Sequence, residues 1–352
     1  MSSATLYRGR RAASIENRHL RVTVLEGGGH IAEVTDKRSG VNPLWTPEWP
    51  SIEPSTYDAS SDTVYGGDVE APLLASIMGH NLCLDIFGGP SAEEHAAGVT
   101  PHGEASVVAY EIDASSGYLA MQAPLPEARL RVERRIELHD RTVRVREAVE
   151  NVAATDRPVA WTQHVTLGPP FLEKGQTQFR ASATRSKVVE APFGPADYLV
   201  TGAEFDWPHA PRASGGSADL RVFTDAKVSG AYTAHLMNPG VPDAYFAAFS
   251  PRAQLAFGYV WKQADFPWLG IWEENQSRVN PPWNGRALTR GLEFGVSPFA
   301  ESRRQMIDRG RLFGVPTYRW IPAMSRVHVE YWIVTGRAEA VPETLEWPGR
   351  AE

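Results

Sequence analysis

The sequence predicts an all-β protein built from large antiparallel sheets. Apolar and polar residues alternate over many short segments, as they do in strands that bury one face. Clusters of Gly, Pro and Ser separate these segments and supply turns. Only residues 301–309 have a helical pattern, so the strand–helix alternation of an α/β protein is missing. We therefore expect two packed antiparallel sheets in one domain, residues 1–352.

The most regular strands lie in the first half of the chain. Residues 20–25 and 31–34 predict a hairpin whose turn contains three consecutive glycines. Residues 130–138, 143–149 and 158–167 alternate strongly and are separated by short loops. We expect these three strands to pair in order as a meander.

Later segments also have the strand pattern, at 230–237, 243–250, 254–261 and 326–334. By contrast, residues 42–68 have no periodicity and are rich in Trp and Tyr. A long irregular segment inside a compact domain is usually functional or disordered. The aromatic content favours an ordered loop that covers a site.

Composition and charge limit the classes of partner. The net charge of −7 and the isoelectric point near 5.9 argue against nucleic acid or an anionic membrane as the main partner. The chain has one cysteine, Cys83, inside an apolar run, which predicts a buried core residue rather than a disulfide. No secretory signal or 18-residue apolar run is present, so we expect a cytoplasmic protein, monomeric or homodimeric.

One histidine lies inside a predicted strand. The strand at 159–167 must end at Gly168-Pro-Pro, because proline cannot donate to a strand ladder. Side chains alternate between the two faces of a strand, so His164 shares its face with Thr162 and Thr166. This polar face is a poor hydrophobic core and a suitable floor for a polar ligand.

Three polar residues stand out as chemical candidates: His102, His164 and Glu293. Each is near Gly or Pro at a strand end or inside a strand, and imidazole with carboxylate is suited to proton transfer near neutral pH. The sequence has no Gly-x-Ser-x-Gly nucleophile motif and no closely spaced histidine pair that predicts zinc. We therefore expect no metal and no cofactor.

The order of several motifs resembles the galactose mutarotase (aldose 1-epimerase) superfamily. The resemblance extends over residues 15–335 and includes the N-terminal hairpin. Within the superfamily it is nearer to bacterial branches that carry a Phe-Pro-Trp-Leu segment before Gly-Leu-Glu. The motifs concerned are Gly28–Gly40, Pro101-His102-Gly103, Arg134–Leu138, Val149-Glu-Asn151, Gln163–Leu172, Phe266–Trp272 and Gly291-Leu-Glu293.

This resemblance implies a β-supersandwich that forms a galactose mutarotase-like carbohydrate-binding domain, with a small carbohydrate as ligand. It also implies an isomerase that interconverts sugar anomers without metal or cofactor. By similarity, Glu293 takes the proton from the C1 hydroxyl and His164 gives a proton to the ring oxygen. His102 assists at the same oxygen or orients the sugar.

Further residues are candidates for substrate binding: Asp206, Trp207, Arg290 and Trp268. Asp206, or alternatively Asp243, would be the second acidic residue of the family. Arg290 would pair with Glu293 or contact the substrate. Glu273 is the alternative to Glu293 as the carboxylate of the site. Several tryptophans could stack on a sugar ring or belong to the core, namely Trp45, Trp49, Trp207, Trp268 and Trp283.

The sequence also departs from the family pattern. The arginine segment that precedes the His-Gly motif in mutarotases has no counterpart in residues 80–100, and His164 is followed by Val-Thr-Leu-Gly instead of aromatic and Asn residues. Two alternatives therefore stay open beside the isomerase. One is a non-catalytic carbohydrate-binding protein, and the other is a lyase-like or hydrolase-like enzyme on the same fold.

Overall fold

The computed structural model describes residues 5–114 and 117–348. Its strands are β1 (Thr5–Tyr7), β2 (Arg10–Glu16), β3 (Leu20–Leu25), β4 (Ile31–Asp36), β5 (His80–Asp85), β6 (Glu111–Asp113), β7 (Tyr118–Leu125), β8 (Leu130–His139), β9 (Thr142–Asn151), β10 (Arg157–Leu167), β11 (Gln178–Ala181), β12 (Ala183–Val188), β13 (Glu204–Asp206), β14 (His209–Pro211), β15 (Ser217–Asp219), β16 (Ser229–Met237), β17 (Asp243–Ser250), β18 (Leu255–Lys262), β19 (Trp268–Asn275), β20 (Leu288–Gly295), β21 (Arg311–Leu312), β22 (Val315–Pro316), β23 (Arg319–Ile321) and β24 (Arg326–Arg337). Its helices are α1 (Ala71–Leu74), α2 (Ala92–Ala96) and α3 (Arg303–Arg309), with 3-10 turns η1 (Pro54–Thr56), η2 (Thr63–Tyr65) and η3 (Glu104–Ser106).

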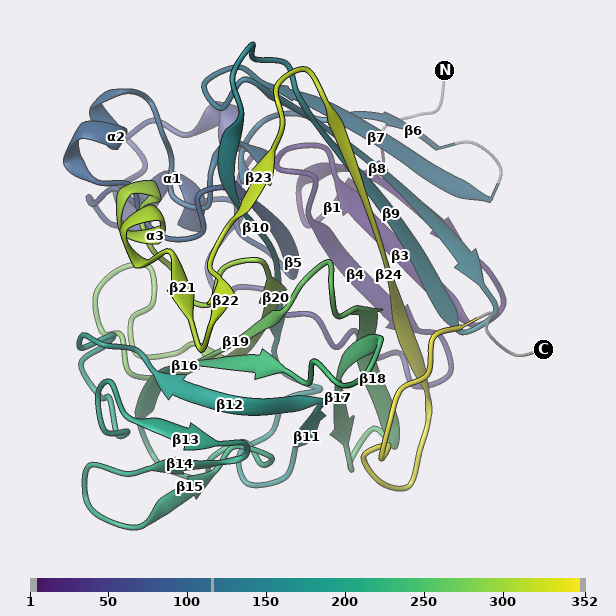
Figure 1. Cartoon of the computed structure of the whole chain (residues 1–352). Helices are drawn as coiled ribbons and strands as arrows, with labels where there is room; N and C mark the ends of the chain where they lie inside the picture. Colours follow the sequence, from purple (N-terminus) through teal and green to yellow (C-terminus); the bar gives the residue numbers. More distant parts are fainter. Residues whose placement is uncertain (1–4, 115–116, 349–352) are drawn as a thin grey trace.

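Two large antiparallel sheets dominate the molecule, so the predicted all-β class is confirmed (Figure 1). In the described residues the first sheet has the order β1-β2-β3-β4-β5-β10-β20-β19-β16-β12-β13, with β23 beside β10. The second has the order β11-β17-β18-β24-β9-β8-β7-β6. Apolar side chains from both sheets form one continuous core between them.

Strand β10 lies at the centre of the first sheet and is covered on both faces. Trp161, Val165 and Leu167 point into the core between the sheets, and each is fully buried. Burying an apolar side chain of this size contributes about 1.5–3 kcal/mol. His164 lies on the opposite face, as the alternation predicts, and its Nδ1 is 3.2 Å from the Thr166 hydroxyl.

The predicted meander is wrong in its last pairing. β8 and β9 pair as expected, from Leu130↔Asn151 to His139↔Thr142. β10 instead pairs with β5 and β20, because β24 occupies the free edge of β9. The short loop after β9 therefore carries the chain from one sheet to the other, a step that strand alternation does not reveal.

A buried ion pair joins the two sheets behind β10. Arg134 of β8 pairs with Glu147 of β9 at 2.9 Å, and both side chains are almost inaccessible to solvent. The Glu147 carboxylate also accepts hydrogen bonds from Trp161, Gln163 and Tyr331 at 2.8–3.1 Å. Since Trp161 and Gln163 belong to β10, this carboxylate ties the first sheet to the second.

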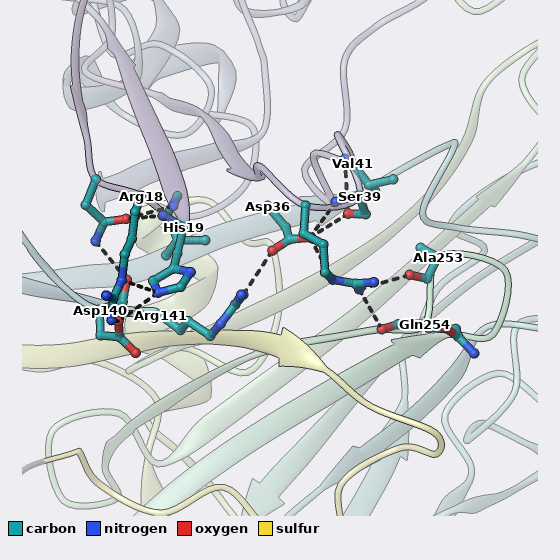
Figure 2. Close-up of polar contacts among 12 residues, drawn as sticks. Arg18, His19, Asp36, Ser39, Val41, Asp140, Arg141, Ala253 and Gln254 are labelled. Atoms are coloured by element: carbon teal, nitrogen blue, oxygen red, sulfur yellow. Dashed lines mark hydrogen bonds and ion pairs between the residues drawn. The ribbon is translucent and has the colours of Figure 1, made fainter.

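A second polar link lies at one end of the sandwich, shown in Figure 2. Asp36, fully buried at the end of β4, accepts a hydrogen bond from Arg141 at 3.0 Å, and Arg141 lies in the β8–β9 turn. Arg38 donates to the carbonyl oxygens of Ala253 and Gln254 in the β17–β18 turn. Burial opposes ionisation, but hydrogen bonds from Ser39 and the charge of Arg141 hold the pKa of Asp36 below its ordinary value.

The outer face of the first sheet is covered by irregular chain and by the three short helices, which lie together at the left of Figure 1. Trp45 and Trp283 stack at 6.1 Å, and Trp49 meets both rings edge-on. Trp49 also donates from Nε1 to the Leu74 carbonyl at 2.8 Å. These contacts order the aromatic loop, as expected. No helix in the described ranges is long and apolar enough to cross a membrane.

Replacing Glu147 by Gln should destabilise the protein by about 3–5 kcal/mol, because Arg134 then keeps its charge in the core without a counter-ion. Urea unfolding of the two proteins measures this difference. Asp308→Asn is the control, since it breaks an exposed pair with Arg304 (2.7 Å) and should cost less than about 1 kcal/mol. Equal costs for the two variants would contradict the structural role of the buried pair.

Candidate functional site

Strand register places three polar residues in a row across the first sheet. His164 of β10 lies opposite Asn81 of β5 on one side and opposite Glu293 of β20 on the other. The His164 Nε2 atom is 3.0 Å from Glu293 Oε1, and the carboxylate is 2% exposed. Side chains directly opposite in an antiparallel pair are close enough to interact, so the register alone brings the imidazole and carboxylate together.

His102 reaches the same place from a loop. Its Nδ1 lies 3.1 Å from the Asn81 side-chain nitrogen, and its ring centroid is 4.7 Å from that of His164. The His102 backbone has φ +63°, a left-handed conformation that is uncommon outside glycine. Backbone hydrogen bonds with Gly88 and Leu84 hold it there. Strained backbone of this kind clusters at functional sites.

Glycines leave room for the Glu293 carboxylate. Gly291 and Gly295 flank Glu293 on the same face of β20, and Gly270 lies opposite it on β19. A Cβ at Gly291 would overlap Glu293 Oε1, and a Cβ at Gly270 would overlap the Tyr232 hydroxyl. These positions therefore need glycine because of the space the side chains occupy.

Hydrogen bonding indicates the tautomers of the two histidines. An amide nitrogen only donates, so Asn81 donates to His102 Nδ1, and the neutral ring of His102 carries its proton on Nε2. The carboxylate of Glu293 only accepts when ionised, so His164 carries its proton on Nε2 and can accept from Thr166 at Nδ1. His102 can therefore offer an N–H to a ligand.

These groups border a pocket of about 210 Å³ on the outer face of the first sheet. Its polar side chains in the described structure are Glu70, His102, His164, Tyr232, Arg278 and Glu293. The rest of the lining is mostly apolar, with Trp272 and Trp283 near His164. The volume is suited to a small molecule with a few fixed polar contacts.

The electrostatics of the site follow from burial beside one carboxylate. Burial lowers the pKa of His102 well below its ordinary value, and nearby His164 and His30 act in the same direction. Burial and the Glu293 charge raise the pKa values of Tyr232 and Cys83. His102 is therefore neutral near pH 7 and acts as a hydrogen-bond donor rather than as a cation. In the described chain no cluster of His, Cys, Asp and Glu is arranged to hold a metal ion.

The structure brings together His102, His164 and Glu293 and places the other candidates elsewhere. Arg290 lies on the opposite face of β20, where it pairs with Glu273 at 2.9 Å. Trp268 shares the outer face of β19 but is covered, and its Nε1 donates to the Pro316 carbonyl.

Asp206 and Trp207 also lie away from the pocket. Asp206 ends β13 at the far edge of the first sheet and is exposed. Trp207 packs edge-on against His235 at 5.0 Å. Of the five tryptophans considered for stacking, Trp283 alone lines the pocket in the described structure.

Sequence reasoning missed several lining residues. Trp272 follows Trp268 by four positions in one strand, so their common face could have been recognised from alternation. Tyr232 and Arg278 carried no such signal, because only the pairing of distant strands and a long loop brings them to the pocket. The same is true of Asn81, which contacts His102 beside the pocket.

Comparison with known structures identifies the class of fold. No protein-family model and no curated protein matches this sequence. Among solved structures, a candidate aldose 1-epimerase from Klebsiella pneumoniae is 13% identical with TM-score 0.64, covering 94% of this chain and 80% of that one. An aldose epimerase homologue from C. elegans is 12% identical with TM-score 0.60, covering 94% and 99%. A galactose mutarotase-like protein from Lactobacillus casei is 13% identical with TM-score 0.54, covering 92% and 100%.

The chain therefore has the galactose mutarotase-like fold, as its motifs predicted. At these identities the likeness concerns the fold. The ligand and the chemistry must be argued from the site itself.

Gly291→Ala should destabilise the protein by about 1–3 kcal/mol, because the added methyl overlaps the Glu293 carboxylate. Thermal unfolding measures the effect. Gly67→Ala is the control, since a Cβ there meets nothing and its φ is not left-handed, so this variant should be neutral or slightly stabilised. A neutral Gly291→Ala would show that the carboxylate is not confined as described.

Acidification should destabilise the fold through buried histidines. Burial lowers the pKa of His30 and His235 to about 3 and that of His80 well below its ordinary value. The unfolded chain binds protons at these residues near pH 6.5, whereas the folded protein keeps them neutral to lower pH. Stability is therefore full above about pH 6.5 and falls below it, by about 1.4 kcal/mol per pH unit for each histidine.

Urea unfolding between pH 7 and pH 5 tests this dependence. His235→Gln should reduce the slope of unfolding free energy against pH, whatever it does to stability at pH 7. His328→Gln is the matched control, because it makes the same substitution at an exposed position. The same slope in all three proteins would contradict the assignment.

Proposed function

We propose that this protein is an aldose 1-epimerase-type enzyme that interconverts sugar anomers by acid/base ring opening. The observation that supports it most is the convergence of a carboxylate and two imidazoles on one sugar-sized pocket, with His164 Nε2 3.0 Å from Glu293 Oε1. An acid and a base on one small volume are what proton transfer requires.

In this mechanism His164 first takes up a second proton at Nδ1; it then donates its Nε2 proton to the ring oxygen and becomes neutral, while Glu293 accepts the proton of the C1 hydroxyl. The bond between C1 and the ring oxygen breaks, and an open-chain aldehyde forms. Rotation about C1–C2 presents the other face of the aldehyde, and reversal of both proton transfers closes the ring. His102, held by Asn81, donates from Nε2 and orients the sugar.

Further expectations belong to the same proposal. The ligand is a single small carbohydrate, and the chemistry requires neither metal nor cofactor. The chain acts as one carbohydrate-binding domain, monomeric or homodimeric, in the cytoplasm. The acidic net charge of −7 supports a partner other than nucleic acid.

A non-catalytic carbohydrate-binding protein is the second candidate. It is favoured by the direct pairing of His164 with Glu293, which satisfies both groups without a ligand. The arginine segment typical of mutarotases is also missing from residues 80–100. Binding of sugars without faster anomer exchange would support this candidate.

Glu293→Gln should slow anomer exchange by about 10²–10⁴-fold, because an amide cannot accept the C1 proton. NMR exchange spectroscopy or polarimetry on a panel of aldoses measures the rate. Glu204→Gln makes the same chemical change at an exposed site and should keep wild-type turnover. If Glu293→Gln also keeps it, Glu293 is not the base.

A further inference from the structure

One side of the pocket is formed by an aliphatic wall, namely Leu73, Leu74 and Ile77. Leu73 and Leu74 end helix α1, and Ile77 follows one turn later with its backbone N–H bonded to the Leu73 carbonyl. All three line the pocket and are 4–6% exposed. They pack in one cluster with Trp272 and Trp283.

An aliphatic wall discriminates between ligands in a way that aromatic lining does not. Trp and Tyr rings accept either a sugar face or an apolar group, because they combine a flat apolar body with a polar edge. Leucine and isoleucine side chains have no hydrogen-bonding atoms. A sugar hydroxyl placed against them loses its water and gains no partner, which lowers affinity by about 5- to 100-fold.

Few polar side chains remain for the rest of a sugar. In the described structure His102, His164 and Glu293 surround the reacting centre, and the Tyr232 hydroxyl donates to the Pro298 carbonyl. The Arg278 guanidinium lies 4.9 Å from the centroid of the Trp283 ring, and its Nε is 3.6 Å from Glu274. Glu70, Arg278 and the Trp272 Nε1 atom, a buried donor without a partner in the described structure, remain to bind hydroxyl groups, and the aliphatic wall supplies none.

We propose that the substrate is a deoxy sugar, in which a methyl group replaces a hydroxymethyl group and packs against the aliphatic wall. The inference rests on the proposed function for the sugar nature of the ligand. It adds that Leu73, Leu74 and Ile77 determine specificity. They exclude the extra hydroxyl by offering it no hydrogen bond.

Matched sugar pairs test this inference with the full chain. The pairs are D-fucose with D-galactose, 6-deoxy-D-glucose with D-glucose, and L-rhamnose with L-mannose. We measure Kd by calorimetry and kcat/KM for anomer exchange by NMR. In at least one pair the deoxy sugar should be favoured by about 5-fold or more in Kd, and in kcat/KM if exchange is catalysed.

Two substitutions at one position separate polarity from size. Leu73→Asn places an amide in the wall and should reduce the preference to less than about 2-fold or reverse it. Leu73→Ala enlarges the pocket without a polar group and should keep the direction of the preference. Val279→Asn, at a residue 76% exposed, is the matched control and should behave as wild type. Thermal unfolding confirms that each variant is folded.

The outcomes separate this inference from the proposed function. Tighter binding of a deoxy sugar without anomer exchange would support the inference and overturn the enzymatic proposal. Exchange with no deoxy preference in any pair would overturn the inference and leave the enzyme. An unchanged preference in Leu73→Asn, or no binding by any of the six sugars, would also overturn it.

Discussion

The candidate site depends on the register of three neighbouring strands. Pairing of β5, β10 and β20 sets Asn81, His164 and Glu293 side by side on one face of the first sheet. A shift of one residue in any pair would move a side chain to the opposite face, so the site exists only in this register. The apolar residues that alternate with these groups fix it, because the same shift would expose them.

The two faces of β10 make different contacts. Toward the second sheet, Trp161 and Gln163 donate to the buried Glu147 carboxylate, which is paired with Arg134. Toward the pocket, His164 meets Glu293 at 3.0 Å. Hydrogen bonds on the core side hold the strand that carries the imidazole, so the buried ion pair supports the geometry of the site from behind.

The pocket has polar side chains at its floor and mostly apolar side chains around it. The floor comes from regular strands, whose positions are set by backbone hydrogen bonding. The surround comes from irregular chain: the segment with Leu73 and Ile77, and the loop with Trp283. Loops can vary while the strands beneath them keep their arrangement, which agrees with a common fold at 12–13% identity.

Particular residues show what local pattern can predict. Alternation was enough to place His164 opposite the core, and the fold class followed from the strand pattern and the order of motifs. Local pattern also favoured pairing of β10 with β9. This pairing is wrong because β24, which is far away in sequence, pairs with β9 instead. One of the two alternatives for Arg290 was a pair with Glu293, but three positions along a strand set these residues on opposite faces.

The sequence by itself determined the position of several long strands and which of their faces is apolar, because both depend on residues near one another. The tertiary structure decided which strands are neighbours, and so which polar side chains meet. Asn81 orients His102, glycines make space for Glu293, and leucines close the pocket. All three arrangements depend on contacts between distant segments. Their energies arise only when the sheets have paired and packed.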